Sequence, residues 1–198
     1  MIDMILKLRN DLKENLSPLR YEHTLSVSFI CTALAMRYGC DLNQAELAGL
    51  LHDCAKYYRN DEMIKKCRKQ GILLTDDELK APVVLHAKYG AWLAEHKYNI
   101  AEQEVLNAIR WHTTGRPDMS LLEKIVFTAD YIEPRRDRAP DLPHVRSLAF
   151  MDLDECVFQI LSNTLEYLES KGNFVDTVSK QAYDYYKQVH NEKKGEKR

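Results

Sequence analysis

The sequence predicts an all-α fold, a helical bundle of about nine helices with the 3.6-residue apolar period of buried helix faces. Apolar residues recur three and four positions apart in segment after segment, and no segment alternates apolar and polar residues over the length of a strand. Residues that cap helices precede several of these segments. The period and the caps therefore point to the same fold class.

Four helices are predicted in the first part of the chain. Ser17 and Pro18 suit an N-cap and a first helical position, and Gly39 ends the helix that they open. Asp41 begins the next helix, and Gly71 follows a short polar one. These predicted helices cover residues 2–16, 17–38, 41–51 and 61–70.

The later helices are marked in the same way. Thr75 in "TDDE" and Ser120 in "SLLE" have capping-box spacing, and Pro82 opens a helix after Ala81. Residues 133–144, "EPRRDRAPDLPH", hold three prolines and three arginines and cannot form one continuous helix. Besides a turn after Thr75, the predicted helices cover residues 81–93, 100–112, 120–132, 152–171 and 175–190.

Length and composition predict one domain. A chain of 198 residues with 45% hydrophobic content can bury a sizeable core. We expect a single domain over 1–198, with a helical core at about 17–170, a C-terminal helix at 175–192 and a frayed tail at 193–198. The formal net charge of −2 gives no electrostatic footprint for nonspecific nucleic-acid binding.

Cysteine usage and hydropathy indicate a cytoplasmic protein. The five cysteines are an odd number without a C-x-x-C pair, which favours neither a disulfide framework nor a zinc ribbon. The N-terminus "MIDMILKLRNDLKENL" carries acids and a helical period, unlike a signal peptide. No run approaches the ~20 apolar residues of a membrane span, so no membrane partner is expected.

Six histidines and aspartates lie on or beside the apolar faces of five predicted helices. They are His23, His52, Asp53, His86, His112 and Asp130. A single such residue is usually a hydrogen-bonded core residue, but six inward-pointing polar groups need a common partner, because burying unpaired charge costs several kcal/mol. A cluster of divalent cations is the economical partner.

The chemistry of the six donors narrows the choice of metal. Four imidazoles and two carboxylates disfavour structural zinc and Ca²⁺, and they suit Fe, Mn, Co, Ni or catalytic Zn. Two ions sharing six ligands keep open positions for water and substrate, as catalytic sites do. The other histidines, His96, His144 and His190, stand in polar surroundings and are expected at the surface.

The order of the six residues resembles the H…HD…H…H…D pattern of HD-domain metal-dependent phosphohydrolases. The words "SPLRYEHT", "HDCAK", "LHAKYGAWLA", "RWHTTGRPDMS" and "ADYIEPRRD" resemble the bacterial HD family known as YqeK, from about Ser17 to Arg138. That resemblance implies a symmetrical bis(5′-nucleosyl)-tetraphosphatase, which splits diadenosine tetraphosphate into two ADP with a water activated between two metal ions. We expect the two ions to be iron, with Mn, Co or Ni as alternatives.

The resemblance also implies a division of the ligands between the two ions. Asp53 would bridge them, since one carboxylate can give an oxygen to each. One ion would be held by His23, His52 and Asp130, and the other by His86 and His112.

Cations near the ligands suit a polyphosphate substrate. Lys56 shares a helix face with His52 and Asp53, and Arg20 shares one with His23, so both are expected to contact phosphate and assist catalysis. Surface ion pairing is the alternative for each. The Glu-Pro-Arg word, through its likeness to the family's, makes Arg135 the preferred third cation, with Arg136 and Arg138 solvated.

Two further segments carry open alternatives. Thr113, Thr114 and Gly115 in "HTTG" offer hydroxyls and backbone N–H groups to phosphate, or else form a helix C-terminal turn. A nucleotide base could stack on an aromatic residue near the ligands, or these residues could pack in the core: Tyr57, Tyr58, Trp92 and Trp111. Cys54 has no spare histidine to activate it and is assigned to packing.

Competing functions remain at this level. Other HD enzymes include (p)ppGpp hydrolases and cyclic-dinucleotide phosphodiesterases, but their ED pair and GYP motif are absent here, and a nucleotidase is a third variant. A non-catalytic nucleotide sensor is the alternative from another class. The tyrosine-rich helix "AYDYYKQV" either supports a homodimer or caps the bundle.

Overall fold

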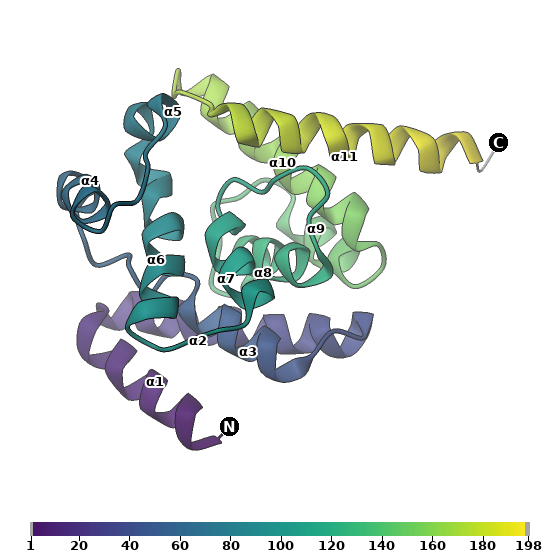
Figure 1. The fold of residues 1–198 in the computed structure, drawn as a ribbon. Coiled ribbons are helices and arrows are strands. Elements are labelled where there is room, and N and C mark those ends of the chain that lie inside the picture. Colours follow the sequence, from purple (N-terminus) through teal and green to yellow (C-terminus); the bar gives the residue numbers. More distant parts are fainter. Residues whose placement is uncertain (1, 197–198) are drawn as a thin grey trace.

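The computed structural model describes residues 2–196, and every regular element in that range is a helix (Figure 1), which confirms the all-α prediction. Eleven α-helices and one 3₁₀ turn lie within these residues. In order they are α1 Ile2–Asn15, α2 Pro18–Tyr38, α3 Leu42–Leu51, α4 Asn60–Lys69, α5 Asp76–Lys80, η1 Pro82–Val84, α6 Leu85–His96, α7 Gln103–Trp111, α8 Leu121–Ile132, α9 Leu142–Ala149, α10 Leu153–Ser170 and α11 Thr177–Glu196.

The helix ends follow the predicted caps. Ser17 accepts a hydrogen bond from the Arg20 backbone at the start of α2, and Gly39, at φ 75°, donates to the last turn of that helix. Thr75 and Ser120 both form complete capping boxes. Local sequence chemistry therefore sets the boundaries of the helices that carry the site.

Helix boundaries differ from the predicted ones at two prolines, Pro82 and Pro143. Pro82 opens the short 3₁₀ turn η1, and α6 starts only at Leu85. Pro143 stands in the first turn of α9, where its missing N–H costs nothing, so only residues 133–141 are irregular. We call residues 133–141 the 133–141 loop. Two additional helices, α9 and the short α5 where only a turn was expected, account for the excess over about nine.

The C-terminal helix is longer than predicted. α11 continues through residues 193–196, which were expected to fray, because Lys193 pairs with Asp152 at 2.8 Å and Asp154 at 3.3 Å. Residues 197 and 198 of the predicted tail lie outside the described residues. Tyr186 is buried, and its hydroxyl accepts the Met119 N–H at 3.1 Å, so this tyrosine-rich helix caps the bundle.

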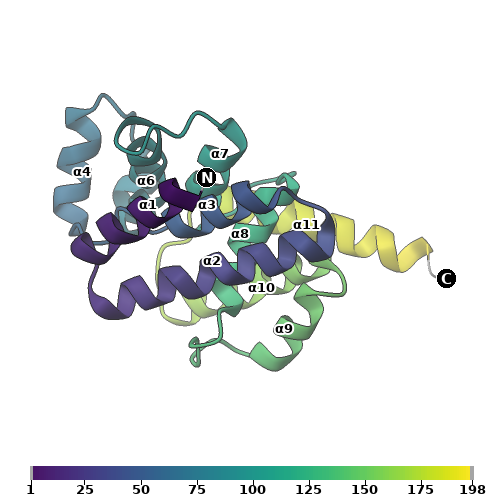
Figure 2. The ribbon, with the colours of Figure 1, turned by 90° about the horizontal axis from the view of Figure 1, so that it is seen from below.

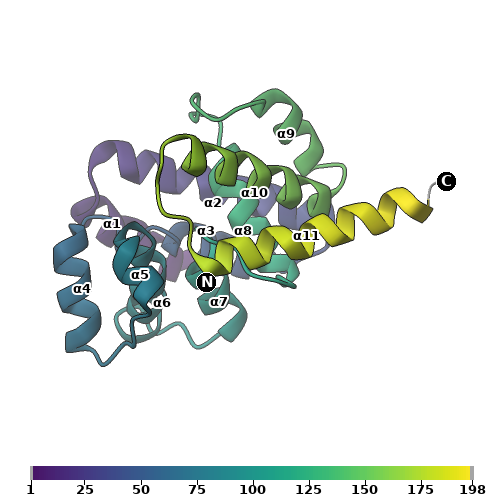
Figure 3. The same cartoon turned by 90° about the horizontal axis from the view of Figure 1, so that it is seen from above.

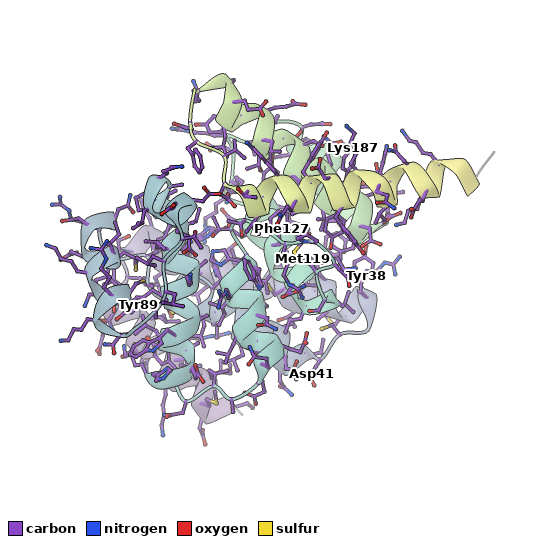
Figure 4. The ribbon with its side chains drawn as sticks, turned by 45° about the horizontal axis from the view of Figure 1, so that its top comes forward. Tyr38, Asp41, Tyr89, Met119, Phe127 and Lys187 are labelled. Atoms are coloured by element: carbon purple, nitrogen blue, oxygen red, sulfur yellow. The ribbon has the colours of Figure 1, made fainter. Side chains whose placement is uncertain are left out.

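The helices pack around one core. Seen from below, α2 runs along α3 and across α8 (Figure 2), and seen from above, α10 and α11 cover the opposite side (Figure 3). α7 packs against α3, α6 and α8. Figure 4 shows Met119 and Phe127 beneath α11, and Tyr89 on α6 at the other side of the bundle. Within residues 2–196, no helix has the length and apolarity needed to cross a membrane.

A glycine allows a close contact between α2 and α3. A Cβ at Gly49 of α3 would lie 2.7 Å from the Cα of Ser28 in α2, closer than packed atoms permit. The approach of α3 to α2 brings the end of α3, at His52, toward His23 of α2. The tight packing of α2 on α3 thus helps to position the site.

Candidate metal centre

The six histidines and aspartates singled out from the sequence meet in the interior. We call them the His/Asp cluster: His23 of α2, His52 and Asp53 at the end of α3, His86 of α6, His112 at the end of α7 and Asp130 of α8. The exposed fraction is at most 3% for four of them, His52, Asp53, His86 and His112. Five helices therefore bring their polar groups into one buried space.

The two carboxylate oxygens of Asp53 face different histidines. Oδ2 lies 3.6 Å from His52 Nε2 and 3.8 Å from His23 Nε2. Oδ1 lies 3.3 Å from His86 Nε2 and 3.6 Å from His112 Nε2. Asp53 is thus the centre of the cluster, with one oxygen for each histidine pair.

Three of the histidines have their tautomer fixed by the main chain. The Nδ1 atoms of His52, His86 and His112 lie 2.6–2.7 Å from the carbonyl oxygen three residues earlier in each case. A carbonyl can only accept, so each Nδ1 carries the proton and each Nε2 turns its lone pair inward. Burial lowers the pKa of His52 to about 4 and that of His86 to about 3, so both rings are neutral at pH 7.

His23 is oriented by a side chain instead. Its Nδ1 lies 3.5 Å from the buried carboxylate of Glu133, and its Nε2 lies 3.1 Å from Asp130 Oδ1. Burial lowers the pKa of His23, but the contact with Asp130 outweighs it and raises the pKa overall. Sequence reasoning did not assign Glu133, although its place three residues after Asp130 on the same helix face is a usable signal.

The cluster is unsatisfied by the protein alone. Among the residues that the structure describes, His52 Nε2 and Asp53 Oδ1 are buried without a hydrogen-bond partner, and the 3.1 Å contact of His23 Nε2 with Asp130 lacks hydrogen-bond geometry. The Nε2 atoms of His86 and His112 face one another at 3.2 Å, although the Nδ1 of each ring already contacts a main-chain carbonyl. Divalent cations would satisfy these lone pairs, so the donor set fits metal ions.

The two carboxylates are ionised and ready to accept a cation. Burial raises the pKa of Asp53, but His52, His112 and Lys56 outweigh it and hold that pKa well below the usual range. Asp130 behaves likewise, because His23 and other neighbours outweigh burial and lower its pKa. Negative charge and inward lone pairs therefore occupy the same space.

Both cations chosen from the sequence reach the cluster. Arg20 donates from Nη1 to Asp53 Oδ2 at 2.7 Å. Lys56 Nζ lies 3.0 Å from His86 Nε2 and 3.8 Å from Asp53 Oδ1. Burial lowers the pKa of Lys56, against the opposing effect of Asp53.

The residues of the "HTTG" segment differ in their roles: one lies in the cluster and two form a helix C-terminal turn. Thr113 Oγ1 lies 3.1 Å from the Nε2 atoms of both His86 and His112, inside the cluster. Gly115, at φ 64°, donates its N–H to the Trp111 carbonyl, and the Thr114 hydroxyl donates to the Gly115 carbonyl. Thr113 therefore joins the site, whereas Thr114 and Gly115 form a helix C-terminal turn.

The structure reverses the roles of two arginines in the 133–141 loop. Arg135 points away from the cluster and donates to the exposed carboxylate of Glu22 at 2.9 Å. Arg136, expected to be solvated, donates to Asp130 Oδ1 at 3.2 Å. The structure therefore does not bring Arg135 to the cluster, and an irregular loop has no helix phase from which to read side-chain direction.

The remaining sequence candidates lie apart from the cluster. His96 stacks on Trp92, and His144 is exposed. The surface prediction is wrong for His190, which is half-buried and pairs with Glu155 at 2.6 Å. Cys54 is buried with its thiol 3.5 Å from the Gly90 carbonyl, as its packing role predicts.

Comparisons with known proteins agree with this geometry. A family model described as "HD domain" matches residues 20–135. The chain is 43% identical to the "Bis(5'-nucleosyl)-tetraphosphatase, symmetrical" of Halalkalibacterium halodurans, over 84% of this chain and 89% of that one. It is 37% identical to the protein of the same name from Staphylococcus aureus, over 92% and 94%.

A solved structure shares the fold. The "predicted HD superfamily hydrolase involved in NAD metabolism" from Clostridium acetobutylicum superposes with a TM-score of 0.89 at 38% identity, covering 92% of this chain and 96% of that one. The matched residues 20–135 contain all six members of the His/Asp cluster. The chain therefore belongs to the HD-domain family, in the group whose curated members are named symmetrical bis(5′-nucleosyl)-tetraphosphatases.

Proposed function

We propose that this protein is a metal-dependent hydrolase that cleaves diadenosine tetraphosphate and related dinucleoside polyphosphates symmetrically, releasing two ADP from the former. The observation that carries the proposal is the orientation of Asp53, whose two oxygens face separate histidine pairs. The names of relatives that are 37–43% identical over most of the chain support the substrate.

The His/Asp cluster divides into two half-sites around Asp53. His23, His52 and Asp130 form one, with donor atoms close enough to share an ion. His86 and His112 form the other, and Asp53 is common to both. Two divalent ions bound there would supply Lewis acidity and a water of lowered pKa for attack on a phosphoanhydride.

The chain's own cations neutralise the substrate. Phosphoanhydrides resist hydrolysis because their negative oxygens repel an incoming hydroxide. Arg20 approaches the cluster from α2 and Lys56 from beyond α3, so the two cations contact phosphoryl oxygens from two directions. The Thr113 hydroxyl provides a neutral hydrogen-bond donor beside them. The charge that develops on the leaving ADP meets these preorganised groups.

Product analysis tests the proposal. Metal-stripped protein would be reloaded with Fe²⁺, Mn²⁺, Co²⁺ or Ni²⁺ and incubated with diadenosine tetraphosphate, and the nucleotides separated by chromatography. ADP as the sole product, absent from the metal-free control, is the expected result. ATP plus AMP would contradict symmetrical cleavage, and no product with metal bound would leave another phosphoester substrate or a sensor role.

Four finer points belong to the same proposal. Iron is the proposed ion, because imidazole and carboxylate donors suit it, with Mn, Co or Ni as substitutes. Residues 1–198 act as a single domain in the cytoplasm. The remaining tyrosines of the helix that Tyr186 anchors to the bundle are proposed to support a homodimer, which sedimentation would test.

A further inference from the structure

A cavity of about 380 Å³ opens directly from the His/Asp cluster. His112, Thr113 and Asp130 line its inner end, and α10 supplies its far wall. Its volume is within the range of about 300–1,000 Å³ that is typical of small-molecule sites. We call it the aromatic cavity, because Phe127, Tyr131 and Tyr167 are among its walls.

The walls of the aromatic cavity change character with depth. Phe127 of α8 and Ile160 of α10 are buried and make an apolar floor. Tyr167, two turns further along α10, is 56% exposed and presents its ring at the outer part. Asn163 and Thr164 add amide and hydroxyl groups between them. An apolar floor with a few polar groups and an accessible aromatic ring suits a purine nucleoside.

Arginines stand where this cavity meets the cluster. Arg136 donates to Asp130 Oδ1, and its guanidinium lies over the ring of Tyr131, 5.6 Å from the centroid. Arg136 and Arg138 also line a second cavity, which contains Arg20 and His23. The phosphates of a bound nucleotide would therefore meet cations on leaving the aromatic cavity, before they reach the cluster.

The aromatic residues favoured by sequence lie elsewhere. Trp111 lines a cavity with Asp77 and Thr177, and Trp92 lines one with Gln103, and neither of these cavities contains a member of the cluster. Tyr131 and Tyr167 are the tyrosines that line the aromatic cavity.

We propose that the aromatic cavity binds one nucleoside of the substrate, with Tyr167 stacking on its base and Arg136 contacting the phosphate nearest to it. The inference rests on the proposed function for the identity of the ligand. The cavity itself is chosen by its continuity with the cluster and by the arginines at the junction.

The test compares Tyr167→Ala with Tyr167→Phe in the metal-loaded protein. Because one base–aromatic stack is removed, Tyr167→Ala should raise the KM for diadenosine tetraphosphate about tenfold with kcat nearly unchanged. It should weaken ADP binding in calorimetry by a similar factor. Tyr167→Phe keeps the ring and should resemble the wild type, and pyrophosphate, which has no base, should bind all three proteins equally.

Tyr57→Ala is the matched control. Tyr57 is a partly exposed tyrosine one residue after Lys56, and it does not line the aromatic cavity. Its replacement should leave both the KM and ADP binding unchanged. Weaker ADP binding in Tyr57→Ala alone would put the base on the other side of the cluster and overturn the proposal.

The two proposals fail in distinguishable ways. If the wild type cleaves diadenosine tetraphosphate and Tyr167→Ala keeps wild-type KM and ADP affinity, the nucleoside site is wrong and the function stands. If the wild type does not cleave it but binds ADP through Tyr167, the function is wrong and the nucleoside site stands. Equal losses of ADP and pyrophosphate binding would mean that Tyr167 acts on the phosphate site, which contradicts stacking.

Discussion

The His/Asp cluster and the 133–141 loop contribute to the same site in different ways. The cluster residues lie on or at the ends of five packed helices, and three of the four histidines are oriented by main-chain carbonyls of their own helix turns. The loop offers side chains from an irregular backbone, where neighbouring Arg135 and Arg136 point to different partners. Helical side chains are fixed by backbone geometry, whereas loop side chains depend on their contacts.

This contrast predicts that the cluster and the 133–141 loop serve different steps, the cluster the chemistry and the loop substrate binding. Replacing a helix-borne ligand should remove the chemistry, and replacing a loop arginine should only weaken substrate binding. The variants below test whether the difference in construction is also a difference in function.

The largest effect is expected at His86 and His112. Replacing either with Ala removes an inward Nε2 lone pair, so hydrolysis should fall by more than the roughly 10- to 100-fold loss typical of groups that merely support ligands. Circular dichroism should still report a helical protein. His144→Ala, at an exposed position on α9, should keep the wild-type rate. A ligand variant with wild-type turnover would disprove the two-metal assignment.

A smaller loss is expected at the helix-side cations. Lys56→Gln and Arg20→Gln each remove a charge that faces Asp53 while keeping much of the side-chain volume. Steady-state kinetics should show kcat/KM lower by roughly a hundredfold, similar to the loss of one preorganised donor in other enzymes. If kcat/KM changed less than twofold in both variants, the two cations would serve only as ion-pair partners of Asp53 and would not act on the substrate.

Replacing the two arginines of the 133–141 loop should have different effects on the kinetics. Arg136→Ala should raise KM about tenfold, because its guanidinium stands at the mouth of the aromatic cavity. Arg135→Ala should leave the kinetics unchanged and cost at most about 1 kcal/mol of stability, because an exposed ion pair with Glu22 is weak. The reverse order of effects on KM would restore the sequence-based preference.

The metal-free protein should lose stability in acid. Burial lowers the pKa of His52 to about 4 and that of His86 to about 3, from 6.5. Below pH 6.5, His52 and His86 become protonated in the unfolded chain while they stay neutral in the folded protein. The free energy of unfolding therefore falls as the pH drops toward 4. The raised pKa of His23 acts oppositely, adding stability below pH 6.5 that is lost as the pH rises through its folded value.

The two histidines with lowered pKa values, His52 and His86, should affect the pH dependence of stability more than His23, whose pKa is raised. Urea denaturation at about pH 7.5 and about pH 5 would measure the change, with each group contributing at most about 1.4 kcal/mol per pH unit. His52→Asn should flatten the dependence. A metal-free protein that is more stable at the lower pH would contradict the neutral, Nδ1-protonated rings.

The part of the site that lies on helices could be predicted from sequence, because the helical period places side chains on a known face. The convergence of the six cluster residues with Arg20 and Lys56 could be predicted because the 3.6-residue helical period indicates which side chains share the buried face. Caps such as Ser17 and Ser120 marked the helix ends. The pairing of Asp53 oxygens with particular histidines required the tertiary packing of α3 against α2 and α7.

Residues outside regular helices were harder to place. Arg136 was missed because the direction of a side chain beyond the end of α8 depends on the loop path and on partners such as Arg146, which donates to the Glu133 carbonyl at 2.9 Å. Glu133 caps the end of α8 and follows the helix phase of Asp130, so its place could have been predicted. The place of Tyr167 in the wall of the aromatic cavity was missed for another reason. Tyr167 lies on a helix, but the cavity that it lines exists only once α10 has packed on α8.

The central claim is that the His/Asp cluster holds two metal ions around Asp53, and metal stoichiometry tests it most directly. Purified protein reloaded with Mn²⁺ or Fe²⁺ and freed of excess ion would be analysed by elemental mass spectrometry. We expect about two ions per chain in the wild type and about one in His86→Ala. One ion or none in the wild type, or an unchanged content in His86→Ala, would contradict the account.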